Sequence, residues 1–149
     1  MPVIVVGADT EHGPAIIEAL LDRAGQVRAF VTDEQAAEDL RARKVHVALG
    51  DVSDASHVEA ASTRCFSAVL ITTAAVDDRE RSFARSDRDV LAGWADAIAT
   101  SAVTRAIWVL DDAHADWDPP DVTPERAVLA VGRAELADEV ARLDDAATL

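Results

Sequence analysis

Along the chain, short apolar runs are followed by segments whose apolar residues recur at helical spacing. This pattern predicts strands that alternate with helices. Residues 3–6 are apolar and β-branched and stop at Gly7, which is typical of a buried strand. Residues 14–24 then carry apolar side chains at helical spacing. Pro14 suits the first turn of this predicted helix, where its missing N–H costs nothing, and Gly25 is expected to end it.

The same alternation continues to the end of the chain. Further strands are predicted over residues 27–31, 45–49, 68–72 and 106–110. Helices are predicted over residues 33–43, 57–61 and 86–102, with a loop at 111–122. A last helix is predicted to open at Thr123 and to carry one apolar stripe, made of Leu129, Leu136, Val140 and Leu143. This order predicts one doubly wound α/β domain over residues 1–149, with a mainly parallel sheet of about five strands in the order 3-2-1-4-5.

Composition and charge narrow the partners. The net charge is −14, and Lys44 is the only lysine among 14 basic residues, which disfavours nucleic acid and anionic membranes as partners. No apolar run approaches the roughly 20 residues of a membrane span, and no signal peptide precedes Gly7, so we expect a cytoplasmic protein. Cys65 cannot form an internal disulfide and is expected to be a buried small residue.

The turn after the first predicted strand carries the main candidate chemistry. Gly7 would let the chain leave the strand sharply, and Gly13 would let the following helix pack close to the sheet. Backbone N–H groups at the start of that helix, with the helix dipole behind them, would then face an anion. Strand, glycine turn and helix in this order are the opening of a dinucleotide-binding unit.

The spacing within this turn points to a family. Gly7 and Gly13 fit the first and last glycines of Gly-x-x-Gly-x-x-Gly, and Thr10 stands at the middle one. This loop and the order of elements resemble the NmrA-like branch of the short-chain dehydrogenase/reductase superfamily. The resemblance implies a Rossmann-like domain with NAD or NADP as its cofactor. It assigns the cofactor to residues at the strand ends, namely Gly7, Asp9, Thr10, Gly13, Thr32, Asp33, Asp51, Val52, Thr72 and Thr73.

Several positions depart from the family pattern. Thr32 stands where a basic residue usually selects the 2′-phosphate of NADP, while Asp33 could accept from a ribose hydroxyl. Catalytic members carry a serine after the fifth strand, where this chain has Asp111. Their Tyr-x-x-x-Lys segment matches Val131 and Glu135, and the chain contains no tyrosine. We therefore expect a non-catalytic nucleotide-binding or regulatory module, with no catalytic residues assigned.

Three alternatives stay open. One is a reductase or epimerase-like enzyme with an unorthodox site. Another is a structural partner protein that has lost nucleotide binding, because Thr10 crowds the backbone and Asp9 and Glu11 would repel an anion by ~1 kcal/mol in water and ~4 kcal/mol at an intermediate dielectric. A third is the regulatory domain of potassium transport systems, whose Gly-x-Gly-x-x-Gly pattern fails here at Asp9 and His12.

The loop after the fifth predicted strand is acidic. Asp111, Asp112, His114, Asp116 and Asp118 crowd it, with Glu135 as a candidate neighbour, but their spacing matches no calcium loop and we expect no metal. His12, His46 and His57 have no ligand spacing. We expect Trp94, Trp108 and Trp117 to be core or interface anchors. The resemblance further implies a homodimer through the helices at 86–102 and 123–143.

Overall fold

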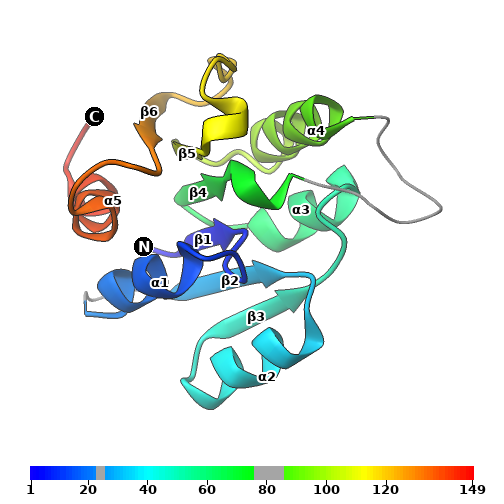
Figure 1. Cartoon of the computed structure of the whole chain (residues 1–149), viewed down its shortest axis with the longest axis vertical. Helices are drawn as coiled ribbons and strands as arrows, with labels where there is room; N and C mark the ends of the chain where they lie inside the picture. The colour runs from blue at the N-terminus through cyan, green and yellow to red at the C-terminus, as the bar shows by residue number, and fades with distance from the viewer. Residues whose placement is uncertain (23–25, 76–85) are drawn as a thin grey trace.

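The fold is seen in a computed structural model that describes residues 1–22, 26–75 and 86–149. It contains a six-stranded sheet in the order β3-β2-β1-β4-β5-β6, and each pair of neighbouring strands is parallel (Figure 1). The strands are β1 (Val3–Val6), β2 (Val27–Val31), β3 (His46–Leu49), β4 (Ser67–Ile71), β5 (Arg105–Leu110) and β6 (Glu125–Ala130). The helices are α1 (Gly13–Leu21), α2 (Glu34–Ala42), α3 (Ala55–Ser62), α4 (Asp87–Thr100) and α5 (Leu136–Asp145), with short 3-10 helices η1 (Thr72–Ala74) and η2 (Asp112–His114).

Helices cover both faces of the sheet. α1, α2 and α5 bury Ile16, Leu40 and Val140 in one core cluster, and α3 and α4 contribute to a second cluster on the other face. Every residue of β1, β4 and β5 is buried, as a strand covered on both sides requires. Trp94 and Trp108 are fully buried, so both are core residues, as the sequence suggested.

The doubly wound parallel architecture and the strand order 3-2-1-4-5 are confirmed, with a sixth strand added beside β5. The predicted elements before residue 111 all form, with ends that move by a few residues. The expected end of the first helix at Ala24 and Gly25 lies outside the described residues. Cys65 is buried as expected, and burial raises the pKa of its thiol. None of the described helices combines the length and the apolar character that a membrane crossing needs.

The prediction of a helix from Thr123 is wrong. Residues 125–130 form β6, which pairs with the outer edge of β5, and α5 begins only at Leu136. The apolar stripe ran through two elements, because Leu129 belongs to the strand and Val140 to the helix. β5 is buried on both faces, and the backbone of its outer edge requires a hydrogen-bonding partner, which outweighs the weak strand preference of an alanine-containing segment.

This correction moves the segment matched to the tyrosine and lysine positions. Residues 131–135 form the turn from β6 to α5 instead of opening a helix after the fifth strand. Glu135 adopts a left-handed backbone with φ of 56° at the start of α5. Residues 111–124 make the crossing from β5 to β6, and Trp117 and Val122 of that crossing pack against the core cluster on the α4 face.

Candidate functional site

The turn between β1 and α1 has two positions that demand glycine. Gly7 has φ of +86°, and a Cβ there would lie 3.0 Å from the Cβ of Ala74. A Cβ at Gly13 would lie 2.0 Å from the carbonyl oxygen of Ala8, so α1 can approach the end of β1 only because this residue has no side chain. Both glycines therefore act as the dinucleotide-binding pattern requires.

Thr10 stabilises this turn through hydrogen bonds to the turn's own backbone. Its N–H and its Oγ1 both donate to the carbonyl oxygen of Gly7, over 3.0 and 2.6 Å. The N–H of Gly13 in turn donates to the carbonyl of Thr10 over 3.0 Å. The threonine side chain thus folds back onto the loop itself, and its branched Cβ remains at the position where the family has glycine.

Asp9 faces the end of β2. One oxygen of its carboxylate, Oδ2, accepts from the backbone N–H groups of Thr32 and Asp33, over 3.0 and 3.1 Å. The carboxylate of Asp33 is engaged in turn as the N-cap of α2, where it accepts from the N–H of Ala36 over 2.9 Å. The negative charge of Asp9 is therefore placed at the adenosine end of the predicted site, not at the helix start.

The turn after β3 separates the next two predicted residues. Asp51 lies at the edge of the sheet, where its Oδ1 accepts from the N–H and Oγ of Ser53, and its own N–H donates to Nδ1 of His57. Val52 belongs to the buried core, and its carbonyl accepts from Nε1 of Trp94 over 2.7 Å. The structure thus turns the Val52 side chain into the core, while Asp51 stays at the sheet edge.

The two threonines after β4 also have different surroundings. Thr72 is fully buried, and its Oγ1 lies 2.7 Å from Oδ1 of Asp111 and accepts from the N–H of Asp111 over 3.0 Å. It therefore ties the end of β4 to the end of β5. Thr73 is half-buried, and its hydroxyl oxygen has no hydrogen-bond partner among the described residues.

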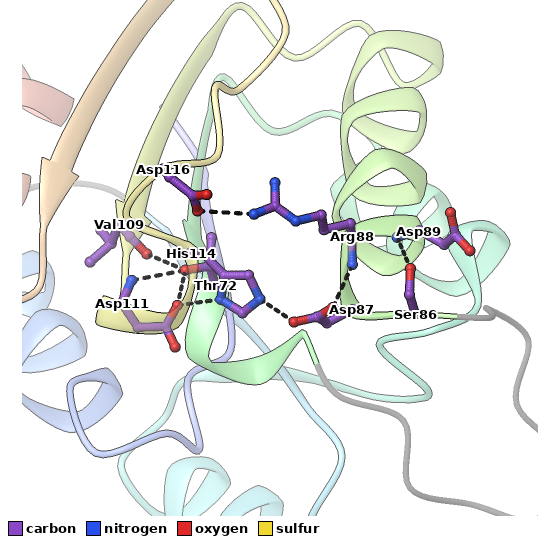
Figure 2. Close-up of polar contacts among 9 residues, drawn as sticks. All are labelled: Thr72, Ser86, Asp87, Arg88, Asp89, Val109, Asp111, His114 and Asp116. Carbon is purple, nitrogen blue, oxygen red and sulfur yellow. Dashed lines mark hydrogen bonds and ion pairs between the residues drawn. The ribbon is translucent and has the colours of Figure 1, made fainter.

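A second polar cluster lies at the ends of β4 and β5 (Figure 2). His114 is 3% exposed and stands between two carboxylates. Its Nδ1 contacts Oδ1 of Asp111, and its Nε2 lies 2.6 Å from Oδ2 of Asp87, the first residue of α4. An ion pair between Arg88 and Asp116, 2.9 Å long, joins the same two segments. The start of α4 is thus fastened to the loop after β5.

The cluster favours a protonated imidazole. Burial lowers the pKa of His114, but hydrogen bonds to Asp111 and Asp87 outweigh this and hold it above the ordinary value of 6.5. The hydrogen bond from His114 keeps the pKa of Asp87 below its ordinary 3.8. Both ring nitrogens can then donate at once, which only the imidazolium form allows.

Only some residues of the acidic loop identified in the sequence come together in the structure. Asp111, His114 and Asp116 make the contacts above, whereas Asp118 only approaches Arg126, at 3.9 Å. Glu135 is exposed at the start of α5, a helix on the sheet face opposite α4. In the described ranges, no three His, Cys, Asp or Glu residues gather as a metal site. No pattern in the sequence pointed to Asp87, which is 27 positions from His114.

Comparison with known proteins identifies the family of the chain. The sequence profile of a family described as NAD(P)H-binding matches residues 7–142. No curated protein sequence matches the chain.

Among solved structures, the triphenylmethane reductase of Citrobacter sp. complexed with NADP(H) has 18% identity and a TM-score of 0.61, over 73% of this chain and 37% of that one. The NADPH-dependent quinone oxidoreductase of Escherichia coli complexed with NADPH has 21% identity and a TM-score of 0.59, over 80% and 40%. The anaerobillin reductase ChuY of Escherichia coli O157:H7 has 25% identity and a TM-score of 0.57, over 74% and 51%. This chain thus spans 37–51% of the length of these neighbours.

Proposed function

The chain belongs to the NAD(P)H-binding family, and we propose that it is a regulatory nucleotide-binding module that does not itself reduce a substrate. Gly7 and Gly13 fit a dinucleotide, since the first gives the sharp turn and the second the close helix that the pyrophosphate site needs. The N-terminus of α1, a helix of nine residues, would face the phosphates. Thr73 offers a buried hydroxyl that has no partner among the described residues.

One observation carries the non-catalytic part of this proposal. When bound, a reduced nicotinamide supplies a hydride, and reductases of the resembling superfamily add a proton from a tyrosine assisted by a lysine. This chain contains no tyrosine, and its single lysine, Lys44, lies between α2 and β3 at the opposite edge of the sheet. The position after β5 holds Asp111, whose carboxylate already contacts Thr72 and His114.

The test is a binding measurement paired with a turnover measurement. Calorimetry with NADH, NAD⁺, NADPH and NADP⁺ should detect binding of at least one form. Incubation of the same protein with NADH or NADPH and a quinone or carbonyl acceptor should oxidise the nicotinamide no faster than buffer alone. Turnover that Asp111→Ala abolishes would contradict the proposal. Absence of binding by all four forms would instead favour a structural partner protein.

A reductase with a different proton donor is the second candidate, and one observation favours it. The side chain of Asp87 is 47% exposed, His114 is buried behind it, and the second oxygen of Asp111 points away from the imidazole (Figure 2). These three groups form a line along which a proton could pass from solvent to the end of β5. His114 would hold the proton that an acceptor takes up together with the hydride. Asp87 would then pass a new proton from water to His114. In that case His114→Gln would lower turnover and remove a limb of its pH profile.

We also propose that the chain forms a homodimer, although α4 and α5 do not together form its interface. α4 and α5 lie on opposite faces of the sheet, so these two helices do not form one continuous interface. The apolar residues of α4, namely Val90, Leu91, Trp94 and Ile98, pack against the sheet within one copy of the chain. Light scattering at micromolar concentration tests the dimer, and a monomer there would rule it out.

A further inference from the structure

The end of β2 carries a feature that bears on which dinucleotide the proposed site accepts. In doubly wound folds the ribose of the adenosine lies at this strand end, where an acidic residue meets a 2′-hydroxyl or a basic residue meets a 2′-phosphate. Here two backbone N–H groups point out of the strand end, from Thr32 and Asp33, and Oδ2 of Asp9 accepts from both. A carboxylate of the chain itself thus occupies two backbone donors at the strand end where a 2′-phosphate would lie.

The charges around this point are negative. Asp9 brings one carboxylate, Asp33 brings a second as the cap of α2, and Glu34 adds a third in the first turn of that helix. A 2′-phosphate would add roughly 1.5 to 2 further negative charges, by analogy with phosphorylated side chains. A ribose 2′-hydroxyl carries no charge and can donate to either aspartate.

The nearby basic side chains of the described residues do not offset this charge. Nη1 of Arg28 in β2 donates to the carbonyls of Ala61 and Thr63, which directs it toward the end of α3. Arg41 lies in the last turn of α2, about 10 Å along the helix from its start. Arg43 pairs with Glu18 of α1 over 2.9 Å. None of these guanidinium groups is placed to receive a phosphate at the end of β2.

We propose that Asp9, through its hold on the end of β2, makes this site select NAD(H) over NADP(H). The inference rests on the proposed function, because it concerns the ligand of the same site. NADP(H) would have to displace the carboxylate of Asp9 from two hydrogen bonds or lie beside it. NAD(H) needs neither and leaves both hydrogen bonds of Asp9 in place. Asp9 is thereby a specificity-determining residue on the glycine turn, separate from the residues of β2 itself.

Titration calorimetry of the full chain with NADH and with NADPH at the same ionic strength tests this. We expect NADH to bind at least about tenfold more tightly, which is about 1.4 kcal/mol. Asp9→Asn keeps an oxygen acceptor and removes the charge. It should therefore reduce the ratio of NADH affinity to NADPH affinity by tightening the binding of NADPH. Thr32→Arg adds a cation at the strand end and leaves Asp9 in place. It should also reduce the ratio of NADH affinity to NADPH affinity by tightening the binding of NADPH.

Asp121→Asn is the matched control. It removes one negative charge from an exposed residue in the crossing that leads to β6, and it should leave the ratio unchanged. Circular dichroism and a thermal melt of each variant show whether it is folded, and Thr32→Arg carries the test if Asp9→Asn does not fold. Equal affinities for NADH and NADPH in the unmodified chain, or a ratio that no variant at the end of β2 alters, would overturn the inference and leave the proposed function standing. Failure of both nucleotides to bind would overturn both.

Discussion

Arg105 and Glu125 stand opposite each other where β5 pairs with β6, and Nε of the arginine donates to Oε2 of the glutamate over 2.6 Å. The arginine is fully buried. Its Nη1 also donates to three carbonyl oxygens at the end of α5, those of Leu143, Asp144 and Ala146. One guanidinium therefore joins β5, β6 and the C-terminus of the last helix, where its charge also complements the helix dipole.

Arg105→Met should destabilise the fold strongly. It leaves the Glu125 carboxylate and three carbonyl oxygens without their donor, and breaking a buried ion pair from one side costs about 3–5 kcal/mol. Glu125→Gln should cost less, because the arginine keeps its three carbonyl partners. Urea unfolding followed by circular dichroism measures both variants. An equal or larger loss for Glu125→Gln would contradict the role given to the helix end.

Gly13→Ala should disrupt the glycine turn. The new Cβ would lie 2.0 Å from the carbonyl oxygen of Ala8, so α1 must move away from the end of β1 at a cost of about 1–3 kcal/mol or more. Gly132→Ala is the matched control, since a Cβ there has no heavy atom within 4 Å. Thermal melts of the two variants should differ clearly, and equal melting temperatures would show that the turn tolerates a side chain.

Thr10→Gly should raise affinity for the dinucleotide and lower stability. Removal of the branched side chain clears the position where the pyrophosphate approaches the backbone. The variant also loses the hydrogen bond to Gly7 and adds backbone freedom to the unfolded chain, together about 1–2 kcal/mol. Thr10→Ser keeps a hydroxyl and should leave stability nearer to the unmodified chain. Calorimetry and urea unfolding separate the two effects, and unchanged binding in Thr10→Gly would show that Thr10 does not obstruct the site.

His114 should make stability depend on pH. Its pKa in the folded protein is raised above the ordinary 6.5, so its contribution is fully present below pH 6.5 and is lost as the pH rises through the folded-state pKa. The pKa of Asp87 is lowered, so its contribution is present above pH 3.8 and is lost as the pH falls through the folded-state pKa. The free energy of unfolding should therefore fall as the pH rises above 6.5 and through the raised pKa of His114.

His114→Gln should remove most of that alkaline slope. Hydrogen bonds to charged partners contribute about 1.5–3 kcal/mol, so the variant should also be less stable at pH 6. His46→Gln is a suitable control, because His46 is an exposed residue of the edge strand β3. Urea unfolding at several pH values measures the slope. The same slope in His114→Gln as in the unmodified chain would show that another group is responsible.

The part of the fold predictable from the sequence is the part that local patterns control. Strands buried on both faces read as continuous apolar runs, as at residues 68–71, and helix caps such as Asp33 mark helix starts. β6 was missed because its identity depends on the edge of β5, a long-range pairing that leaves no local period. The buried partner of Glu125, Arg105, lies 20 residues earlier in the chain.

In the candidate site, too, the features set by local sequence were predictable and those set by long-range packing were not. The glycine turn could be located from Gly7 and Gly13, because backbone geometry restricts those positions to one residue type. The direction of the Asp9 carboxylate could not, since it depends on where the end of β2 lies. The contact of His114 with Asp87 likewise follows from the packing of α4 beside the loop after β5.

The place of Lys44 has a practical consequence for handling the protein. This single lysine of the sequence is exposed and precedes the amino end of β3, a strand of the parallel sheet. A sensor surface or bead that couples through the lysine side chain will therefore hold the molecule by the side of the sheet where the strands begin. The glycine turn and the end of β2 then face the flowing solution, so nucleotide affinities measured on immobilised and on free protein should agree.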